Sequence, residues 1–562
     1  MWELEPQCAG YLGSDQITFN YESSHVCGDL VGNGDMEDGI TYWRHSGEDI
    51  EALPTKGKDG SAAIGSKRRY SPYQGIGQYL DTICMKKNVG KTYEFKAWVK
   101  LVDLSGNPVE CNPSDTHPNR GCPSLTLKKT TLDDTKTTYI DSYQHYVATL
   151  LPPFQKGEFN LIHGIFFVDD SMASAETVYF SIERFNRNHN IIIDDVSMTP
   201  IESSCNDLVR NGKLSNGDAL YWSIWQGGNI EMVQGFDGSD DFALKVYGRW
   251  HWNHGPAQNI KMGCLEEGTR YIVKTKFRLE NPSGQQVNCD PFGWARQTKC
   301  PNIQIIATQP EGNNVYVSVA TMGAPHSDQA WDSLAGYFYA TNQLTRAVKL
   351  IAVITGAFPS LSITVDNFEI IPYPQECDNA ALNPSFDDGS ADFWQTNSVG
   401  NSKIDLYSPG AGGSNYAMRS YDRTRSWMGP LQMIDPKCFV SGEEIVFKAK
   451  TRLINKDGTG AVCNSSHRVA DGKTNCPLIV LQARNCPGNG NFWLWNELDD
   501  PYNADEFNLF QSKLTVTDFL SNCEQLWMTF RFVNEAWDIL LDDVVVTSKT
   551  DVGETRYLRK LS

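Results

Sequence analysis

The stretch GKTYEFKAWVK, residues 90–100, alternates apolar and polar side chains after a glycine turn. In an extended chain, its Tyr, Phe, Ala and Val side chains share one face, and its Glu, Lys and Trp side chains share the other. Because side chains of a β-strand point alternately to two faces, this period of two predicts a half-buried strand. The same pattern returns as GTRYIVKTKFR at 268–278 and GEEIVFKAKTR at 442–452. The chain therefore repeats one strand-containing unit.

The cysteines repeat with the strands. Each copy holds four of them in one order, and the fourth always precedes a proline. Zinc sites favour a close Cys-x2–4-Cys pair, which no copy has, so we expect disulfides rather than metal. We expect the first cysteine to pair with the second, fastening the first strand to the strand before the glycine turn, and the third with the fourth, at a hairpin tip. The four-cysteine sets are Cys27, Cys84, Cys111 and Cys122; Cys205, Cys264, Cys289 and Cys300; and Cys377, Cys438, Cys463 and Cys476. Cys486 and Cys523 are extra and could pair with each other, which leaves Cys8 over.

Short alternating segments, turns rich in glycine and asparagine, and an almost complete lack of helical periodicity predict an all-β fold. We expect three tandem, disulfide-rich β-sandwich (jelly-roll) domains, because the repeats are far longer than those of solenoids. The predicted division is an N-terminal extension at 1–26, unit 1 at 27–201, unit 2 at 205–373, unit 3 at 377–548 and a C-terminal tail at 549–562.

Composition narrows the partners and the compartment. The 562 residues carry a formal net charge of -19, which argues against nucleic acid or an anionic membrane surface as the main partner. No apolar run is long enough to insert into a membrane. Regular cysteines imply an oxidising compartment, so we expect an extracellular, secreted or cell-wall-associated protein. The start at Met1 shows no basic and apolar leader, and we therefore expect a mature or excised portion of such a protein.

Catalytic motifs are missing from the sequence. It holds no His-Glu-x-x-His and no Gly-x-Ser-x-Gly, and its ten histidines share no position between the copies. Paired aspartates close two of the units but become Asp366-Asn367 in unit 2, which disfavours a catalytic carboxylate pair. We expect a protein that is not an enzyme.

Five motifs in a fixed order resemble one family. LVGNGDMEDGITYW (30–43), RYSPYQGIGQYL (69–80), GKTYEFKAWVK (90–100), WDSLAGYF (331–338) and IIIDDVSM (191–198) are similar to motifs of the carbohydrate-binding modules that accompany cellulases and xylanases, families four, nine and twenty-two. The resemblance covers all three units, although the cysteine framework is not part of the usual family pattern. It implies a β-jelly-roll that holds glycan chains, often with a structural calcium ion.

The resemblance also implies sugar-contacting residues. In the family, an aromatic residue in the Arg-to-Gly segment often stacks on a sugar ring, and nearby polar groups bond its hydroxyls. Trp98, on the polar face of its strand, could line a groove, although its counterparts are lysines. The Arg and Gln side chains could instead hold the loop together. The candidates in unit 1 are Arg69, Tyr73, Gln78 and Trp98; in unit 2 Arg249, Trp250, Trp252 and Gln258; and in unit 3 Arg423, Trp427 and Gln432. By contrast, Trp43, Trp222 and Trp394 recur at one position and are expected in the core.

The same resemblance implies calcium ligands. In the family, the Glu after the Asn-Gly turn meets the Asp of the closing strand. In unit 2 the matching residues lack one carboxylate, and the alternative everywhere is a solvated acidic turn. The predicted ligands are Glu37 with Asp194 or Asp195, and Asp387 with Asp542 or Asp543.

Three hypotheses follow. The first is a secreted, non-catalytic protein that binds neutral polysaccharide or another glycan through three modules acting by avidity. The second is a structural extracellular-matrix or cell-wall protein whose sandwiches contact matrix or cell-wall proteins. The third is the accessory binding region of a larger glycoside hydrolase.

Overall fold

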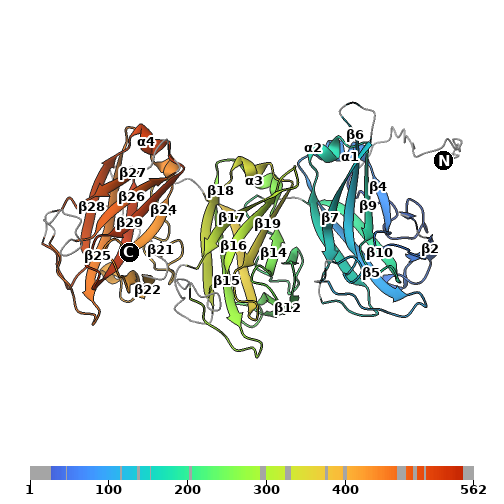
Figure 1. The fold of residues 1–562 in the computed structure, drawn as a ribbon, viewed down its shortest axis with the longest axis horizontal. Coiled ribbons are helices and arrows are strands. Elements are labelled where there is room, and N and C mark those ends of the chain that lie inside the picture. The colour runs from blue at the N-terminus through green and yellow to red at the C-terminus, as the bar shows by residue number, and fades with distance from the viewer. Residues whose placement is uncertain are drawn as a thin grey trace.

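A computed structural model describes residues 27–548, apart from 46, 48, 114, 116, 134, 136–138, 152, 202–204, 291–298, 323–330, 374–376, 397–401, 465–475, 485, 487–489 and 499–500. Cys8, the extension at 1–26 and the tail at 549–562 lie outside the described residues. The described chain is nearly all β, and its strands form three groups that lie in a row in chain order (Figure 1). None of its described helices is long and apolar enough to cross a membrane.

The elements follow the three units. In unit 1 they are β1 (Arg44–His45), β2 (Asp49–Leu53), η1 (Lys58–Gly60), β3 (Ala63–Lys67), β4 (Ile76–Leu80), α1 (Thr82–Lys87), β5 (Thr92–Asp103), β6 (Ser124–Leu132), β7 (Tyr139–Leu150), β8 (Asn160–Phe167), α2 (Asp170–Ala173), β9 (Thr177–Glu183) and β10 (His189–Ile201). In unit 2 they are β11 (Trp222–Trp225), β12 (Asn229–Gln234), β13 (Phe242–Tyr247), β14 (Gly255–Asn259), η2 (Met262–Cys264), β15 (Arg270–Glu280), β16 (Asn302–Thr308), β17 (Asn314–Thr321), β18 (Asp332–Tyr339), α3 (Asn342–Thr345), β19 (Lys349–Thr355) and β20 (Ser362–Pro372). In unit 3 they are β21 (Gln395–Thr396), β22 (Lys403–Tyr407), η3 (Ala411–Gly413), β23 (Ala417–Tyr421), β24 (Pro430–Ile434), η4 (Pro436–Cys438), β25 (Glu444–Asn455), β26 (Leu478–Arg484), β27 (Gly490–Leu494), β28 (Asn508–Thr515), α4 (Asp518–Ser521), β29 (Gln525–Arg531) and β30 (Trp537–Thr547).

One strand order serves all three units. Unit 3 has two five-stranded sheets, β21-β24-β29-β26-β27, which we name the front sheet, and β22-β23-β30-β25-β28, the back sheet. Units 1 and 2 contain the same two orders, joined where β7 pairs with β8 and where β17 pairs with β18. The inner faces of the two sheets pack on each other. In unit 1, for example, Phe95 of the back sheet lies 5.7 Å from Phe180 of the front sheet, ring centre to ring centre.

The opening stretch of each unit closes the core. Trp43, Trp222 and Trp394 are at most 5% exposed, which confirms the expected core position. The indole of Trp43 donates a hydrogen bond to the carbonyl of Asn33, 2.9 Å away. Gly34 follows, and a Cβ there would lie 2.0 Å from the Val196 carbonyl oxygen, so the closing strand leaves no room for a side chain.

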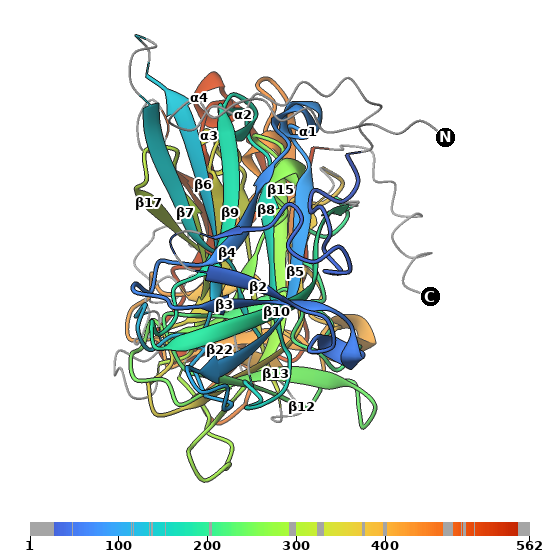
Figure 2. The same cartoon turned by 90° about the vertical axis from the view of Figure 1, so that its right-hand side faces the viewer.

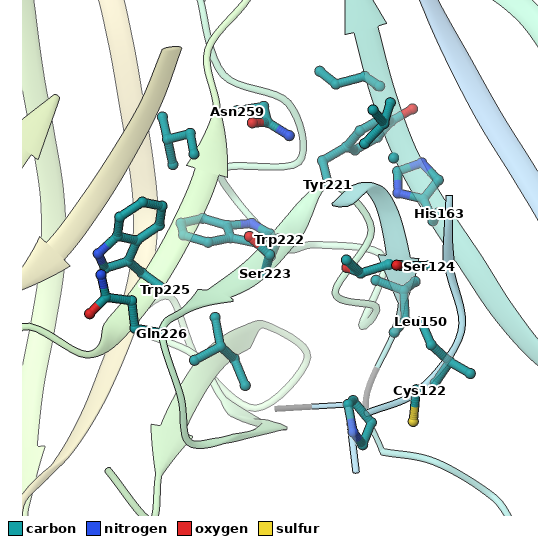
Figure 3. Close-up of a pocket in the computed structure, with 18 of the residues that line it drawn as sticks. Cys122, Ser124, Leu150, His163, Tyr221, Trp222, Ser223, Trp225, Gln226 and Asn259 are labelled. Atoms are coloured by element: carbon teal, nitrogen blue, oxygen red, sulfur yellow. The ribbon is translucent and has the colours of Figure 1, made fainter. Parts of the chain in front are cut away.

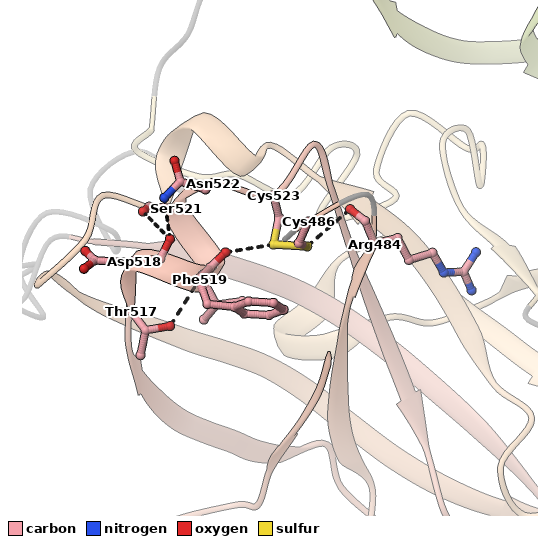
Figure 4. The surroundings of a disulfide bond; sticks show 9 residues. Arg484, Cys486, Thr517, Asp518, Phe519, Ser521, Asn522 and Cys523 are labelled. Atoms are coloured by element: carbon pink, nitrogen blue, oxygen red, sulfur yellow. Dashed lines mark hydrogen bonds between the residues drawn. A yellow bond between two sulfur atoms is a disulfide. The ribbon is translucent and has the colours of Figure 1, made fainter. Parts of the chain in front are cut away.

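The seven disulfides have the predicted partners. Two details of their setting were predicted wrongly. Cys84 lies in the short helix α1, not in a strand, because Asp81 caps that helix by accepting a hydrogen bond from the Ile83 amide at 2.7 Å. The Cys111–Cys122 bond does not close a hairpin, since both cysteines lie in the connection from β5 of the back sheet to β6 of the front sheet. Unit 3 adds the Cys486–Cys523 bond, between the end of β26 and the turn after α4 (Figure 4).

The units dock front sheet to back sheet, and Figure 2 views this row with unit 1 towards the reader. At the first joint, Tyr221, the residue before β11, donates a hydrogen bond to Glu94 on the outer face of β5, at 2.8 Å. At the second joint, Tyr337 of β18 donates to the Met433 carbonyl of β24 at 2.6 Å. The back sheet of each earlier unit is therefore covered, in part, by the front sheet of the next.

Candidate functional site

The three predicted arginines are buried supports of a loop. Each is about 5% exposed or less, and each guanidinium donates hydrogen bonds to several backbone carbonyls. Arg69 donates to Gln74 at 3.0 Å and to Asn186 at 2.9 Å. Arg249 donates to the carbonyls of His254, Phe358 and Leu361. Arg423 donates to those of Met428, Val533, Asn534 and Trp537. Because the backbone occupies these donors, the predicted sugar contact of the arginines is corrected to a structural role.

The three glutamines are likewise occupied. Gln258 is fully buried, and its amide donates to the Arg210 carbonyl and accepts from the Arg210 amide, at 2.6 and 2.9 Å. Gln78 makes the same pair of bonds with Gly32, and Gln432 makes it with Leu382. Each glutamine thus holds the opening stretch of its unit against the front sheet, which removes it from the set of ligand contacts.

The aromatic residues of the same loops face solvent. Tyr73 is 51% exposed, Trp250 63%, Trp252 46% and Trp427 42%. In unit 1 the guanidinium of Arg184 lies 5.4 Å from the centre of the Tyr73 ring. The loops that the buried arginines fix therefore present a flat ring in every unit.

Two further aromatic residues, Trp493 and Trp98, differ in their surroundings. Trp493 of β27 is 43% exposed, and its ring lies 4.7 Å from that of Phe532, whose amide bonds the carbonyl of Ser426 in the unit 3 loop. Sequence reasoning missed Trp493 because no counterpart stands in the other units. Trp98 was predicted to line a groove, but the ammonium of Lys58 lies 4.5 Å from its ring centre and covers it.

The closing strand of each unit fully buries one aspartate, and in units 1 and 3 that aspartate, Asp194 or Asp542, is a predicted calcium ligand. Asp542 is fully buried; its carboxylate accepts hydrogen bonds from the Ala411 amide at 2.7 Å and the Ser414 hydroxyl at 2.8 Å. Burial raises its pKa to about 6, and nearby Asp543 adds to the rise. Burial likewise raises the pKa of Asp366 to about 7, with Asp241 as its carboxylate neighbour, and it raises the pKa of Asp194.

Protein donors thus satisfy these aspartates. Asp194 accepts from the Ser61 hydroxyl and the Lys58 amide, and Glu37 accepts from the Ala62 amide at 3.2 Å. Within the part of the chain that the structure describes, no three His, Cys, Asp or Glu side chains are grouped so that they could hold a metal ion. The donor set does not by itself fit a hard cation, which favours six or more oxygen ligands. Calcium stays a prediction.

The first joint buries a polar cluster. Glu94 is 8% exposed; its carboxylate accepts from Tyr221 at 2.8 Å and from Lys96 at 2.7 Å, and lies 2.9 Å from His163 Nε2. Burial alone would raise the pKa of Glu94, but the hydrogen bonds from His163, Lys96 and Tyr221 outweigh it and lower the pKa to about 2. The carboxylate is therefore ionised at neutral pH and ties unit 2 to unit 1.

A cavity of about 280 Å³ lies beside this cluster (Figure 3). One wall comes from unit 1 and includes His163, Thr149 and Ser124, and the other comes from unit 2 and includes Trp225 and Lys349. Figure 3 shows His163 and Tyr221 on one side of the cavity and Trp225 on the other. The cavity exists only because the two units are docked, so a single unit could not have indicated it.

Comparisons with known proteins add the following. No protein-family model and no curated protein matches the chain. Among solved structures, it is similar to the tandem CBM22-1–CBM22-2 domain of Xyn10C from Paenibacillus barcinonensis, at 14% identity over 62% of this chain and 100% of that one, with a TM-score of 0.24. The CBM22-2 xylan-binding domain of the same protein is 18% identical over 30% of this chain and 98% of that one, with a TM-score of 0.23. The CBM22-1–GH10 modules of Clostridium thermocellum Xyn10B, complexed with xylohexaose, are 17% identical over 34% of this chain and 31% of that one, with a TM-score of 0.23.

Proposed function

We propose that the chain is a secreted, non-catalytic protein that binds a neutral polysaccharide through the aromatic residues of its arginine-anchored loops. One observation carries the proposal: in all three units a buried arginine fixes a loop whose aromatic ring is at least 42% exposed. Single exposed apolar residues are ordinary, but the repeated exposure of a large flat ring at one place on a fixed loop favours a ligand surface. Such a ring can cover the C–H face of a sugar while neighbouring polar groups bond its hydroxyls.

The loops suit a polymer better than a single sugar. Each exposed ring offers a shallow contact, for which we expect a dissociation constant of about micromolar to millimolar, roughly 4–8 kcal/mol. Docked units keep the loops in a fixed relation, so a repeating polymer that matches their spacing gains avidity. The docked joints also support a second candidate, a rigid matrix or cell-wall protein in which protein contacts dominate.

The test is retention of the full chain on a panel of insoluble polysaccharides. Tyr73→Ala, the Trp250→Ala/Trp252→Ala pair and Trp427→Ala are expected to weaken retention about 3–10-fold each, and the combination to abolish it. Tyr316→Ala is the matched control, since Tyr316 is 60% exposed outside these loops. Release of reducing ends from the polymer should be absent.

Two outcomes would contradict the proposal. If the wild-type chain binds no polymer, the first function falls and the matrix candidate takes its place. If the combined variant is retained as well as the Tyr316→Ala control, the aromatic loops are not the site.

Calcium binding is tested separately. If calcium is bound near Glu37 or Asp387, chelation should lower the melting temperature of the chain, and added calcium should restore it. An unchanged melting temperature after exhaustive chelation would contradict the prediction that the chain binds a structural calcium ion.

A further inference from the structure

The cavity between units 1 and 2 holds one charge without a partner. Of its lining residues, Asp115 pairs with Arg120 at 2.8 Å, and His163 lies 2.9 Å from Glu94. The ammonium of Lys349 makes no ion pair or hydrogen bond with any residue that the structure describes. Burial lowers the pKa of Lys349. The Lys349 side chain is partly buried, and an anion in the cavity would offset the cost of removing part of the water from this cation.

A second lining group is also unsatisfied. Ser124 is 1% exposed, and its hydroxyl has no hydrogen-bond partner in the described part of the chain. Because buried hydroxyl groups are nearly always paired, this orphan Oγ indicates a position for a ligand or water oxygen. Lys349 and Ser124 come from different units, so docking brings the two unsatisfied groups to one cavity.

The apolar part of the lining is a tryptophan. Trp225 packs on the outer face of the unit 2 front sheet, against the buried side chains of Ile306, Ile351 and Val353. That packing fixes the indole ring at the cavity wall. The hydroxyl of Tyr221, by contrast, is already bonded to Glu94 and does not add a free donor.

The other units show that the fold does not demand the lysine. Lys349 pairs with Thr308 in the sheet, and the same position is Thr177 in unit 1, opposite Thr130, and Gln525 in unit 3, opposite Arg484. The second joint is instead closed by its own contacts. Ser333 donates to Asp392 at 3.0 Å, Tyr339 donates to Asp435 at 2.9 Å, and Arg270 pairs with Asp435 at 3.4 Å.

We propose that the cavity at the first joint binds a carboxylate-bearing sugar, a hexuronate residue of a glycan, with its carboxylate on Lys349, a hydroxyl on Ser124 and its ring against Trp225. The inference rests on the proposed function in so far as the ligand is a glycan, and it adds an acidic sugar to the neutral polymer expected at the loops. Ligand pockets usually begin at about 300 Å³, so a cavity of about 280 Å³ suits one or two sugar rings, as at a chain end or side branch. Inside a protein the carboxylate–ammonium attraction is stronger than in water, which gives the acidic sugar its advantage over a neutral one.

The test is isothermal titration calorimetry on the full chain with three probes. Digalacturonic acid carries the ring and the charge, neutral galactobiose carries the ring alone, and acetate carries the charge alone. We expect digalacturonic acid to bind at least tenfold more tightly than either of the others, and added salt to weaken it.

Variants locate the binding. Lys349→Gln should weaken the binding of digalacturonic acid at least tenfold, and Ser124→Ala should weaken that binding about 3–10-fold. Lys213→Gln, at an exposed lysine that does not line the cavity, should leave it unchanged. A melting curve shows whether each variant folds. If Lys349→Gln does not fold, Ser124→Ala still tests whether the cavity binds the probe.

The outcomes separate this inference from the proposed function. Equal binding of acidic and neutral disaccharides, or unchanged binding in both Lys349→Gln and Ser124→Ala, overturns the cavity site, and polymer retention through the loops can still stand. Selective binding that Lys349→Gln abolishes supports the cavity site, even if no neutral polymer is retained.

Discussion

At the scale of single residues, buried arginines organise the surface that we propose as the ligand site. Arg423 is 3% exposed, and its guanidinium donates to the Met428 carbonyl of the aromatic loop and to three carbonyls where β29 turns into β30. Burial lowers its pKa to about 10, so it remains protonated at neutral pH. The residue that is chemically most suited to bond a sugar is therefore used to hold Trp427 in place.

Arg423→Ala should lower the free energy of unfolding of unit 3 by about 2–4 kcal/mol. The substitution removes the donor and leaves several buried carbonyls without a partner, each of which costs about 1–3 kcal/mol before the loop relaxes. Chemical denaturation followed by circular dichroism measures the change. Arg425→Ala, at an exposed arginine two residues away, should change the free energy by less than about 0.5 kcal/mol. Similar losses in the two variants would refute the anchoring role.

Glu94 gives a prediction on pH. Its folded pKa of about 2 lies below the ordinary value of 4.5, so the folded state binds fewer protons than the unfolded state between these values. Stabilisation by Glu94 is therefore complete above about pH 4.5 and is lost as the pH falls towards 2.

We expect the wild-type melting temperature to fall more steeply between pH 4.5 and 2 than that of Glu94→Gln, which should already be less stable at pH 7. Glu110→Gln removes a carboxylate that is 72% exposed and should retain the wild-type slope. Parallel melting-temperature curves for wild type and Glu94→Gln would contradict the assignment.

At the scale of elements, unit 3 differs from the others by its fifth and sixth cysteines. Cys486 follows β26 and Cys523 follows α4, which Thr517 caps by accepting from the Leu520 amide (Figure 4). The disulfide ties the short helix to the end of a front-sheet strand.

Replacing both cysteines by serine should lower the free energy of unfolding of unit 3 by about 2–4 kcal/mol, because the bond restricts the unfolded chain. The bond spans 37 residues, whereas Cys463–Cys476 spans 13. In the chain-entropy account the longer span contributes about 1 kcal/mol more. Denaturation of the two double variants compares them, and a larger loss for the 13-residue span would count against that account.

The features of the fold that could be predicted from the sequence are those that local sequence patterns determine. The strand β5, the disulfide partners and the buried Trp43 depend on alternation, spacing and repetition, which a sequence displays directly. The sequence could not decide between a sugar contact and a loop-anchoring role for Arg69, because an arginine suits both an exposed ligand contact and a buried anchor. The sequence contains no signal for Lys349 and Ser124, because the two residues line one cavity only when units 1 and 2 dock.

At the scale of the whole molecule, the contacts at the two joints determine how the three units are arranged in a row. Tyr42, Tyr221 and Phe393 occupy one position in the three units, and each has a positive φ, between 68° and 72°. Tyr221 docks on unit 1, and the Phe393 ring lies 5.1 Å from the Lys274 ammonium of unit 2. Tyr42, in the first unit, is 67% exposed.

Tyr221→Ala should loosen the first joint. It removes a hydrogen bond to a buried carboxylate, which contributes about 1.5–3 kcal/mol. Small-angle X-ray scattering should then give a larger radius of gyration and a broader distance distribution. Tyr42→Ala, at the same position without a preceding unit among the described residues, should leave the scattering unchanged. Equal effects of the two variants would show that Tyr221 acts within its own unit.

The backbone of Tyr42 carries a consequence for how such arrays grow. Tyr42 has nearly the same positive φ as Tyr221 and Phe393, which contact the preceding unit. Among the described residues no preceding unit contacts Tyr42. The backbone conformation at this position therefore forms within a unit and does not require a docked neighbour among the described residues. Duplication or loss of a whole unit would lengthen or shorten the row while the remaining joints stay intact, so that array length can vary independently of the fold.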